Sequence, residues 1–194
     1  MSKTKVAIFG GSFDPIHNGH LALAREVLSR AIADEVWLMI TPQNPHKQGS
    51  ALSDEHLRLQ MVEQAVAGMD GARACDFEFS LPRPSYTFNT LAALDDAFPE
   101  KEFILLIGAD NWEKFDRWYK GGEILSRYGI VVYPRGGGEQ PALPAGVQWL
   151  PAKLYDISST MIRSLVRVGK DVSHLVPTVV ADFIKDKKMY KDAK

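Results

Sequence analysis

A glycine-framed loop near the start of the chain holds two histidines at a spacing suited to phosphate chemistry. The loop reads GGSFDPIHNGH, and His17 and His20 lie three residues apart with Gly19 between them. Glycines let a phosphate approach the backbone, and the helix expected after the loop adds unpaired N–H groups and partial positive charge. Each imidazole can donate a hydrogen bond to an oxygen that gains charge during transfer. The pattern indicates a phosphate site.

This loop differs from the two common nucleotide-binding motifs. Its glycines do not fit G-x-G-x-x-G, and no Gly-Lys-Ser/Thr follows them. The structural alternative is that the histidines only cap local backbone, which is the more frequent role of a single loop histidine. Two histidines in one glycine-framed loop after a first strand favour the phosphate site over that alternative.

A second cluster, DISSTMIR, places three hydroxyls at the start of a predicted helix. Arg163 follows one turn inside that helix. Hydroxyls and free N–H groups at a helix N-terminus can hold phosphate oxygens, and a guanidinium can pair with them in a bidentate way. A plain Ser/Thr cap with a solvated arginine has the same sequence. The segment alone therefore leaves a cap and a phosphate site equally open.

Further candidates follow the later strands, each with a structural alternative. Asp110 comes after the most apolar strand, where it either accepts hydrogen bonds from ribose hydroxyls or caps a helix. Trp112, Trp118 and Tyr119 form an aromatic stretch, and at least one of them is expected in the core. Thr87 begins a predicted helix, either as an N-cap or as a donor to an anionic ligand.

Four other residues have a solvated or structural role as the default. His46 and Lys47 lie in a polar loop, and Arg135 stands beside a glycine run. Arg135 faces solvent unless its loop reaches a nucleotide near the strand ends. Cys75 is the single cysteine, which excludes an intramolecular disulfide and a CxxC site, and a buried structural thiol is expected.

Alternating strands and helices must position these loops. Apolar runs and period-two patterns predict strands at 5–9, 35–41, 75–79, 103–107, 130–133 and 147–150. Helical spacing and capping residues predict helices at 20–32, from 53 through 65, and at 87–98, 111–119, 158–168 and 177–188. This alternation is typical of an α/β fold with a doubly wound parallel sheet covered on both faces. The loops after residues 9, 41, 79, 107 and 150 should converge at the carboxyl ends of the strands.

Composition limits the class of protein. The chain has 194 residues, of which 45% are hydrophobic and 24% charged, with a formal charge of −1. These values predict one globular domain over 1–194, with a helical C-terminal part from about residue 158. The weak charge gives no basic field for nucleic acid. The short apolar run at the N-terminus is neither a signal core nor a membrane span, so a cytoplasmic protein without a membrane partner is expected.

Together the two motifs resemble the nucleotidyltransferase superfamily that carries HxGH near the N-terminus and ISSTxIR near the C-terminus. Here these are residues 17–20 and 157–163. Other segments are similar to the bacterial nicotinate-nucleotide adenylyltransferases within that superfamily: the GGSFDP opening, Pro45-His46-Lys47, Tyr86-Thr87, and Gly108-Ala109-Asp110 with Trp118. The resemblance runs from residue 6 to about residue 190. It implies a Rossmann-like fold of the nucleotidyltransferase type.

The resemblance also implies a site. The expected catalytic residues are His17, His20 and Arg163. The expected ATP contacts are Gly10, Gly11, Ser12, Phe13, His17, Gly19, His20, Gly108, Asp110, Ile157, Ser158, Ser159 and Arg163. The expected contacts to the second substrate are Ser12, His46, Lys47, Tyr86, Thr87, Trp118 and Tyr119, with Trp118 stacked on a pyridine ring. No protein metal site is expected, and Mg²⁺ should arrive with ATP.

The implied reaction is transfer of the adenylyl group of ATP to nicotinate mononucleotide, giving deamido-NAD and pyrophosphate. Two rival functions stay open: an adenylyltransferase for phosphopantetheine or nicotinamide mononucleotide, and a nucleotide sensor without turnover. The expected partners are ATP and nicotinate mononucleotide. The sequence leaves the oligomeric state, including a homodimer, undecided.

Overall fold

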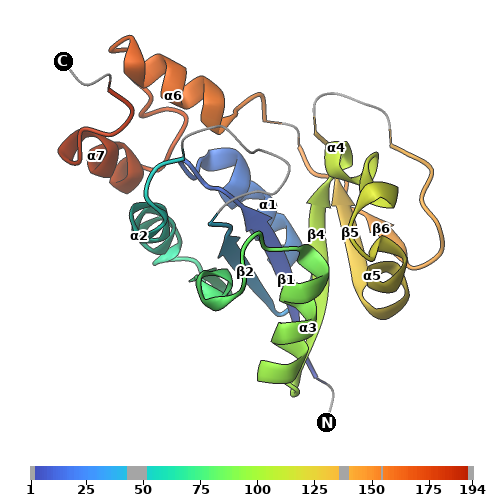
Figure 1. Ribbon diagram of the computed structural model, residues 1–194. Coiled ribbons are helices and arrows are strands. Elements are labelled where there is room, and N and C mark those ends of the chain that lie inside the picture. The colour runs from blue at the N-terminus through green and yellow to red at the C-terminus, as the bar shows by residue number, and fades with distance from the viewer. Residues whose placement is uncertain (1–2, 43–51, 136–139, 154, 192–194) are drawn as a thin grey trace.

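The core of the fold is a parallel sheet whose strands end at one common edge. The computed structural model describes residues 3–42, 52–135, 140–153 and 155–191. The sheet has six strands in the order β3-β2-β1-β4-β5-β6, and every pairing is parallel (Figure 1). The strands are β1 (Thr4–Gly11), β2 (Glu35–Ile40), β3 (Ala72–Cys75), β4 (Lys101–Gly108), β5 (Gly129–Tyr133) and β6 (Val147–Trp149). The predicted parallel α/β sheet is confirmed.

Helices cover both faces of this sheet. They are α1 (Asn18–Ser29), α2 (Glu55–Val66), α3 (Thr87–Ala97), α4 (Ala109–Trp112), α5 (Gly121–Arg127), α6 (Ser159–Arg167) and α7 (Thr178–Asp186), with short 3-10 turns η1 (Phe77–Ser80) and η2 (Phe115–Arg117). In β1, Ala7 and Phe9 pack with α1, α2, α6 and α7, whereas Val6 and Ile8 pack with α3 and α5. Alternate residues of one strand therefore enter two apolar clusters, as a doubly wound sheet requires.

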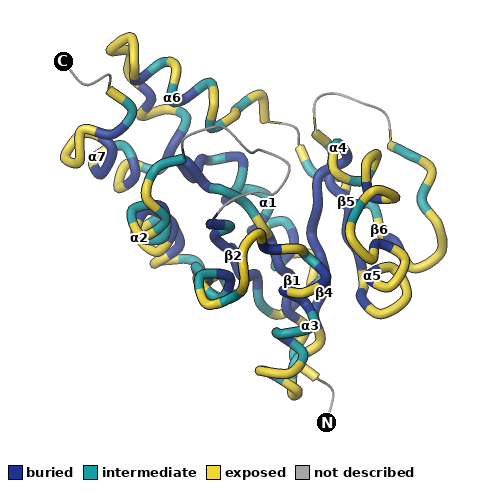
Figure 2. The backbone as a smooth tube through the Cα atoms, viewed as in Figure 1, coloured by how far each residue is buried: buried dark blue, intermediate teal, exposed yellow. Residues whose placement is uncertain are grey.

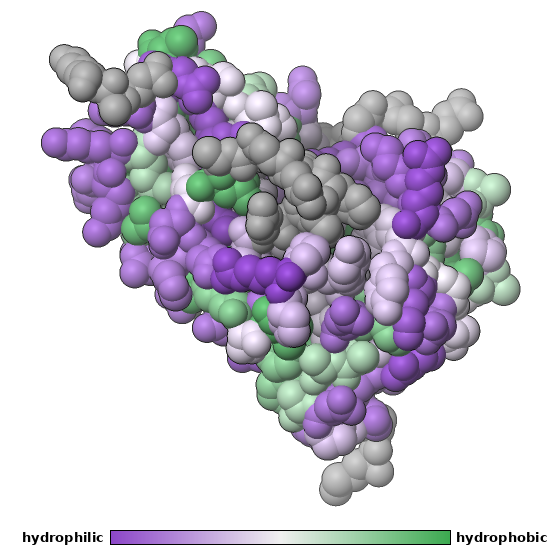
Figure 3. Space-filling view, viewed as in Figure 1, coloured by the Kyte–Doolittle hydropathy of each residue, from purple (hydrophilic) through white to green (hydrophobic). Residues whose placement is uncertain are grey.

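Burial follows this two-sided arrangement. The central strands are buried along their length and the outer turns of the helices are exposed (Figure 2). Hydrophilic residues dominate the face of Figure 3, and apolar residues occupy small separate areas. Within the described ranges, none of the helices has the length and apolar character needed to cross a membrane.

Two predicted elements were wrong, and one helix was missed. Strand β3 covers 72–75 rather than 75–79. The residues after Cys75 alternate like a strand but form η1, in which the Phe79 N–H donates to the carbonyl of Asp76 at 2.8 Å and closes a helical turn. The predicted helix at 111–119 is divided into α4 and η2. Helix α5 follows without having been predicted, because its seven residues offer too short a repeat.

Smaller differences lie at the helix ends. Helix α1 begins at Asn18 and stops at Ser29, so His20 lies in its first turn rather than at its start. Helix α2 is capped by Asp54 rather than Ser53, since the Asp54 carboxylate accepts from two backbone N–H groups at 2.9 and 3.2 Å. Pro177 is the N-cap of α7 and not its first residue.

Candidate active site

A buried arginine of α2 holds the loop between β1 and α1 in place. The Arg58 guanidinium is 1% exposed, and its Nη1 donates to the carbonyls of Ser12 at 2.7 Å and Thr41 at 2.9 Å. Its Nε donates to the carbonyl of Ser53 at 2.9 Å. One side chain therefore ties together the loops that leave β1 and β2. Such a fixed frame is what a loop needs to present groups at defined positions.

His17 and His20 lie face to face at the start of α1. Their ring centroids are 3.6 Å apart, and the planes meet at 24°. The backbone N–H of His17, the N-cap residue, donates to Nδ1 of His20 at 3.2 Å. Because Nδ1 of His20 accepts, a neutral His20 carries its proton on Nε2. The pair thus does cap local backbone, as the structural alternative proposed, and it still has ring N–H groups to offer.

Both imidazoles are kept neutral by their surroundings. Burial lowers the pKa of His17 to about 4, with the nearby charge of Arg135 acting in the same direction. Burial also lowers the pKa of His20 well below its ordinary value, with His17 and Arg135 adding to the effect. Near neutral pH the pair therefore offers N–H dipoles rather than positive charges.

The side chains of the second motif hold the first loop. Ser158 caps α6 and accepts from the Met161 N–H at 3.1 Å. Ser159 Oγ donates to the carbonyl of Pro15 at 2.9 Å, and Arg163 Nη1 donates to the carbonyl of Asp14 at 2.7 Å. The predicted cap is confirmed at Ser158, while Ser159 and Arg163 are half-buried and donate to the first loop instead of capping α6. They support the loop that carries the histidines.

A cleft beside the histidines opens at the carboxyl ends of the strands. We call it the histidine cleft. Its lining residues are His17, Gly19, His20, Leu23, Tyr133, Pro134, Arg135, Lys153, Tyr155 and Ile157. The structure therefore brings His17, Gly19, His20 and Ile157 together, as predicted. A Cβ on Gly19 would lie 3.1 Å from Nδ1 of His17, so a larger residue would crowd the imidazole.

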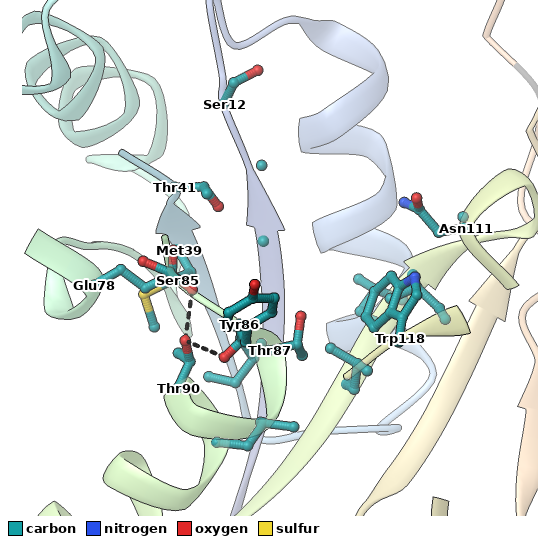
Figure 4. Close-up of a pocket in the computed structure, with 18 of the residues that line it drawn as sticks. Ser12, Met39, Thr41, Glu78, Ser85, Tyr86, Thr87, Thr90, Asn111 and Trp118 are labelled. Atoms are coloured by element: carbon teal, nitrogen blue, oxygen red, sulfur yellow. Dashed lines mark hydrogen bonds between the residues drawn. The ribbon is translucent and has the colours of Figure 1, made fainter. Parts of the chain in front are cut away.

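A second cavity lies next to the histidine cleft, between β1, β4 and the start of α3 (Figure 4). We call it the aromatic pocket. The predicted residues that line it are Gly10, Gly11, Ser12, Tyr86, Thr87, Gly108, Trp118 and Tyr119. Tyr86 and Thr87 lie on one side and Trp118 on the other, as Figure 4 shows. Tyr133 and Arg135 line both cavities, so the two are neighbours.

The wall at α3 combines a helix start with aromatic rings. Thr87 is the first residue of α3, as predicted, and Tyr86 is the N-cap, so the alternative of Thr87 as an N-cap is wrong. The N–H groups of a first helical turn have no partner within the helix and suit an anion. The rings of Tyr86 and Tyr119 lie 5.1 Å apart across this wall.

The aromatic stretch divides between the edge of the core and the pocket. Trp112 stacks on Phe115 with centroids 5.1 Å apart and packs on the apolar cluster of α3 and α5. Trp118 also touches that cluster and exposes part of its ring to the pocket. Trp112 and Trp118 are both half-buried at the edge of the core and Tyr119 is exposed, so the expectation that at least one of these rings is buried in the core was wrong.

Asp110 has one free oxygen and one weak ion pair. It lies inside the first turn of α4, whose N-cap is Gly108, so the alternative of an Asp110 cap is wrong. Its Oδ2 lies 3.7 Å from Nε of Arg135, and among the described residues its buried Oδ1 has no hydrogen-bond partner. A Cβ on Gly108 would come within 2.6 Å of that Oδ1, which is why glycine stands there.

Five predicted contacts do not line either cavity. Phe13 is 1% exposed and packs edge-on against His20 with centroids 5.0 Å apart, so it supports the imidazole from behind and lines neither cavity. Its φ of +45° lets the loop turn under β1. Ser158, Ser159, Arg163 and Asp110 are likewise absent from the lining of both cavities. His46 and Lys47 lie outside the described residues.

Sequence reasoning missed several lining residues. Tyr133 is the last residue of β5, and the end of that strand was left out of the converging loops, although it is a carboxyl end like the others. Arg135, which was expected to face solvent unless its loop reached a nucleotide, lines both cavities. Lys153 and Tyr155 follow β6 and had no motif to mark them. Glu78 and Ser85, buried in the wall of the aromatic pocket, carried no spacing signal.

The comparisons with known proteins agree with this geometry. A family model described as cytidylyltransferase-like matches residues 8–165, so the fold and the two motifs are those of that class of nucleotidyltransferases. A probable nicotinate-nucleotide adenylyltransferase of Bacteroides fragilis is 47% identical over 93% of this chain and 90% of its own, and one of Cytophaga hutchinsonii is 40% identical over 97% and 99%. The chain belongs to the nicotinate-nucleotide adenylyltransferase family.

Solved structures support the same fold. A putative nicotinate-nucleotide adenylyltransferase from Vibrio parahaemolyticus aligns with a TM-score of 0.72 at 27% identity, covering 94% of this chain and 99% of that one. The nicotinic acid mononucleotide adenylyltransferase of Plasmodium falciparum, complexed with NaAD, aligns with a TM-score of 0.80 at 18% identity, covering 96% and 97%.

Proposed function

We propose that this protein transfers the adenylyl group of ATP to nicotinate mononucleotide, forming deamido-NAD and pyrophosphate. The observation that carries the proposal is the pair of adjoining cavities that share Tyr133 and Arg135. One cavity has two neutral imidazoles and suits a triphosphate; the other has aromatic walls and a helix start and suits an acidic pyridine. The names of the relatives, with 47% and 40% identity, point to the same reaction.

The chemistry needs positioning more than a base. The phosphate of the mononucleotide has a second pKa of about 6, so its oxygen is already ionised near neutral pH. That oxygen attacks the α-phosphorus of ATP, a new P–O bond forms, and the bond to the bridging oxygen breaks as pyrophosphate leaves. His20 Nε2–H and the His17 ring then donate to α- and β-phosphate oxygens that gain negative charge.

Arg163 acts in this proposal mainly through the loop. Its Nη1 donates to the carbonyl of Asp14, and a guanidinium has five N–H donors, so others are free to reach a β- or γ-phosphate. Ser159 holds the same loop through Pro15. The proposed catalytic set of His17, His20 and Arg163 therefore comprises two donors and one residue that combines support with phosphate contact.

Mg²⁺ enters as part of the ATP complex in this proposal. In the described part of the chain no group of three His, Cys, Asp or Glu side chains could form a metal site. In this proposal the ion is held by phosphate oxygens and water, the ligands that Mg²⁺ commonly keeps in nucleotide sites. When bound, the ion would neutralise charge on the triphosphate.

The aromatic pocket would select the acidic substrate. The first turn of α3 at Thr87 offers N–H groups and a favourable dipole to a carboxylate and less to an amide. Trp118 would stack on the pyridine ring, with Tyr119 beside it. Gly10, Gly11, Ser12 and Gly108 line the space between the substrates, where close approach of a phosphate is needed.

Pyrophosphate release by the purified protein tests the proposal. It is measured with Mg-ATP and, in parallel, nicotinate mononucleotide, nicotinamide mononucleotide and phosphopantetheine. We expect release with the first acceptor at a kcat/KM at least tenfold above the others. Release with another acceptor alone would overturn the substrate and keep the reaction. ATP binding with no release in any of the three would overturn the proposal in favour of a nucleotide sensor.

A further inference from the structure

A buried carboxyl group lies in the wall of the aromatic pocket and has no part in the proposed chemistry. Glu78, in the 3-10 turn after β3, is 7% exposed and lines the pocket. Figure 4 shows it on the side of Ser85, Thr90 and Tyr86, across the pocket from Trp118. The described part of the chain provides no ion pair to it and no hydrogen-bond partner for its Oε2.

Thr90 connects this carboxyl to the start of α3. Its Oγ1 lies 2.8 Å from Oε1 of Glu78 and 3.3 Å from the carbonyl oxygen of Tyr86. The backbone N–H of Thr90 also reaches that carbonyl, at 3.0 Å. Tyr86 is the N-cap of α3, and the first-turn N–H groups that follow it face the site proposed for the substrate's acid group.

Hydrogen counting favours an uncharged Glu78. A threonine hydroxyl has one hydrogen, so it can donate to Glu78 or to Tyr86 but not to both. If the carboxyl is protonated, its Oε1 can donate to Thr90 Oγ1 over the 2.8 Å distance, and the single hydrogen of Thr90 is left for the longer contact of 3.3 Å with the Tyr86 carbonyl. An ionised carboxylate would instead leave a buried, charged Oε2 without a partner, which is costly.

Burial of the carboxyl favours this assignment, and two neighbouring hydroxyls act against it. Burial raises the pKa of Glu78, although hydroxyl hydrogen bonds from Thr90 and Thr41 oppose the increase. These two hydroxyls, one at the end of β2 and one in α3, are the polar groups that act on it.

We propose that Glu78 is a positioning residue for the acidic substrate: as a neutral acid it donates to Thr90, which holds the Tyr86 carbonyl and with it the first turn of α3. This inference rests on the proposed function, because it assigns that turn to the pyridine carboxylate. Glu78 does not touch the reacting atoms. Its effect is on substrate affinity and on the preference for an acid over an amide.

The test compares four variants. Glu78→Ala and Thr90→Val break the chain of hydrogen bonds, whereas Glu78→Gln keeps a neutral donor of the same size. Asp95→Asn is the matched control, because Asp95 also lies on α3 and accepts a hydroxyl hydrogen bond, from Tyr128 at 2.7 Å, but lines neither cavity. Steady-state kinetics are measured with each substrate varied in turn.

We expect Glu78→Ala and Thr90→Val to raise the KM for nicotinate mononucleotide by about tenfold, the value of one or two hydrogen bonds. The KM for ATP and kcat should stay within about twofold, and the preference over nicotinamide mononucleotide should fall by a similar factor. Glu78→Gln and Asp95→Asn should remain close to the wild type. A Gln variant as impaired as the Ala variant would overturn the neutral acid, and equal increases in both KM values would overturn the positioning role.

A second measurement separates this inference from the proposed function. Hydrogen exchange of the peptide covering 86–90, followed by mass spectrometry without substrate, should be faster in Glu78→Ala and Thr90→Val than in the wild type, and unchanged in Glu78→Gln. Unchanged exchange in all variants would overturn the inference even if the enzyme turns over. Wild-type protein without turnover, but with the expected exchange pattern, would overturn the proposed function alone.

Discussion

The two motifs that mark this family differ in how the structure uses them. In the first, His17, Gly19 and His20 line the histidine cleft. In the second, Ser158 caps its own helix, while Ser159 and Arg163 donate to carbonyls of the first loop at 2.9 and 2.7 Å. Residues of the first motif line a cavity, and residues of the second hold the backbone of the loop that carries the first. Two motifs that are equally recognisable in the sequence therefore have different places in the structure.

Substitutions in the first motif, residues 17–20, should have the largest effect on kcat. We expect His20→Ala to lower kcat by about 100-fold or more, because a donor to developing negative charge is lost. His20→Asn is the informative partner: its amide oxygen can replace Nδ1 as acceptor for the His17 N–H but cannot reproduce the Nε2–H. Both variants should lose kcat while thermal unfolding of His20→Asn stays near that of the wild type. Full activity in His20→Asn would mean that His20 only caps α1.

Asp110 tests whether a partly unpaired side chain behaves as a ligand contact. Its buried Oδ1 has no partner among the described residues, which suits a hydroxyl donor such as a ribose. We expect Asp110→Ala to raise the KM for ATP by about tenfold with little change in the KM for the mononucleotide. Initial rates with ATP varied measure this effect. An unchanged KM for ATP would leave Asp110 only its contact with Arg135.

Substitutions in the second motif, residues 157–163, should affect stability as well as rate. We expect Arg163→Met to lower the free energy of unfolding by about 1–3 kcal/mol, since the loss of its charged donor leaves the carbonyl of Asp14 without that hydrogen bond. Urea unfolding measures the change, and kcat should fall in the same variant. Reduced kcat with unchanged stability would make Arg163 a ligand contact and remove the contrast between the motifs.

Through His17 and His20, the stability of the folded protein should decrease as the pH is lowered. The pKa of His17 is lowered to about 4, and that of His20 is also lowered, so between about 6.5 and 4 the unfolded chain binds more protons than the folded one. The free energy of unfolding should therefore decrease as the pH falls through this window and be level above it. Urea midpoints of the wild type and His17→Asn give the histidine contribution by difference. If the free energy of unfolding depended on pH identically in both proteins, the contribution of His17 would be contradicted.

The smallest expected effect concerns a distant support of the same loop. Tyr190 donates to Oδ1 of Asp14 at 2.7 Å, and Asp14 is 1% exposed. Tyr190→Phe should lower the free energy of unfolding by about 1 kcal/mol and reduce kcat by a few fold. Tyr128→Phe is the control, because it removes a hydrogen bond of the same length to Asp95, away from both cavities. It should affect stability only, and equal losses of kcat would show that the loop needs no support from Tyr190.

The sequence predicted the fold where apolar patterns were long. The apolar runs of β1, β2 and β4 and the helical repeats of α1 and α3 were sufficient to predict these elements. A buried strand and an amphipathic helix each have a regular hydrophobic pattern in the sequence. Short elements were harder: η1 alternates like a strand, and α4, η2 and α5 are held by tertiary packing. Local propensity and hydrophobic pattern do not determine the conformation of such short elements.

The candidate site was predicted in part for a similar reason. His17, His20, Tyr86 and Trp118 belong to recognisable segments, and the structure places them at the two cavities. Glu78, Tyr133 and Lys153 reach the same cavities only through the folded path of the chain, so nothing in their local sequence marks them. The partners of Ser159 and Arg163 could not be predicted either, because the sequence does not show which distant carbonyl a donor will meet.

The hydrogen bond between Tyr190 and Asp14 joins residues separated by 176 positions. During synthesis the strands of the sheet leave the ribosome before α6 and Tyr190. The loop with the histidines therefore gains its hydrogen bonds from Ser159, Arg163 and Tyr190 only after the whole sheet has been translated. A nascent chain released before that point would have the sheet without the completed loop. Activity should therefore appear later in translation than the sheet itself.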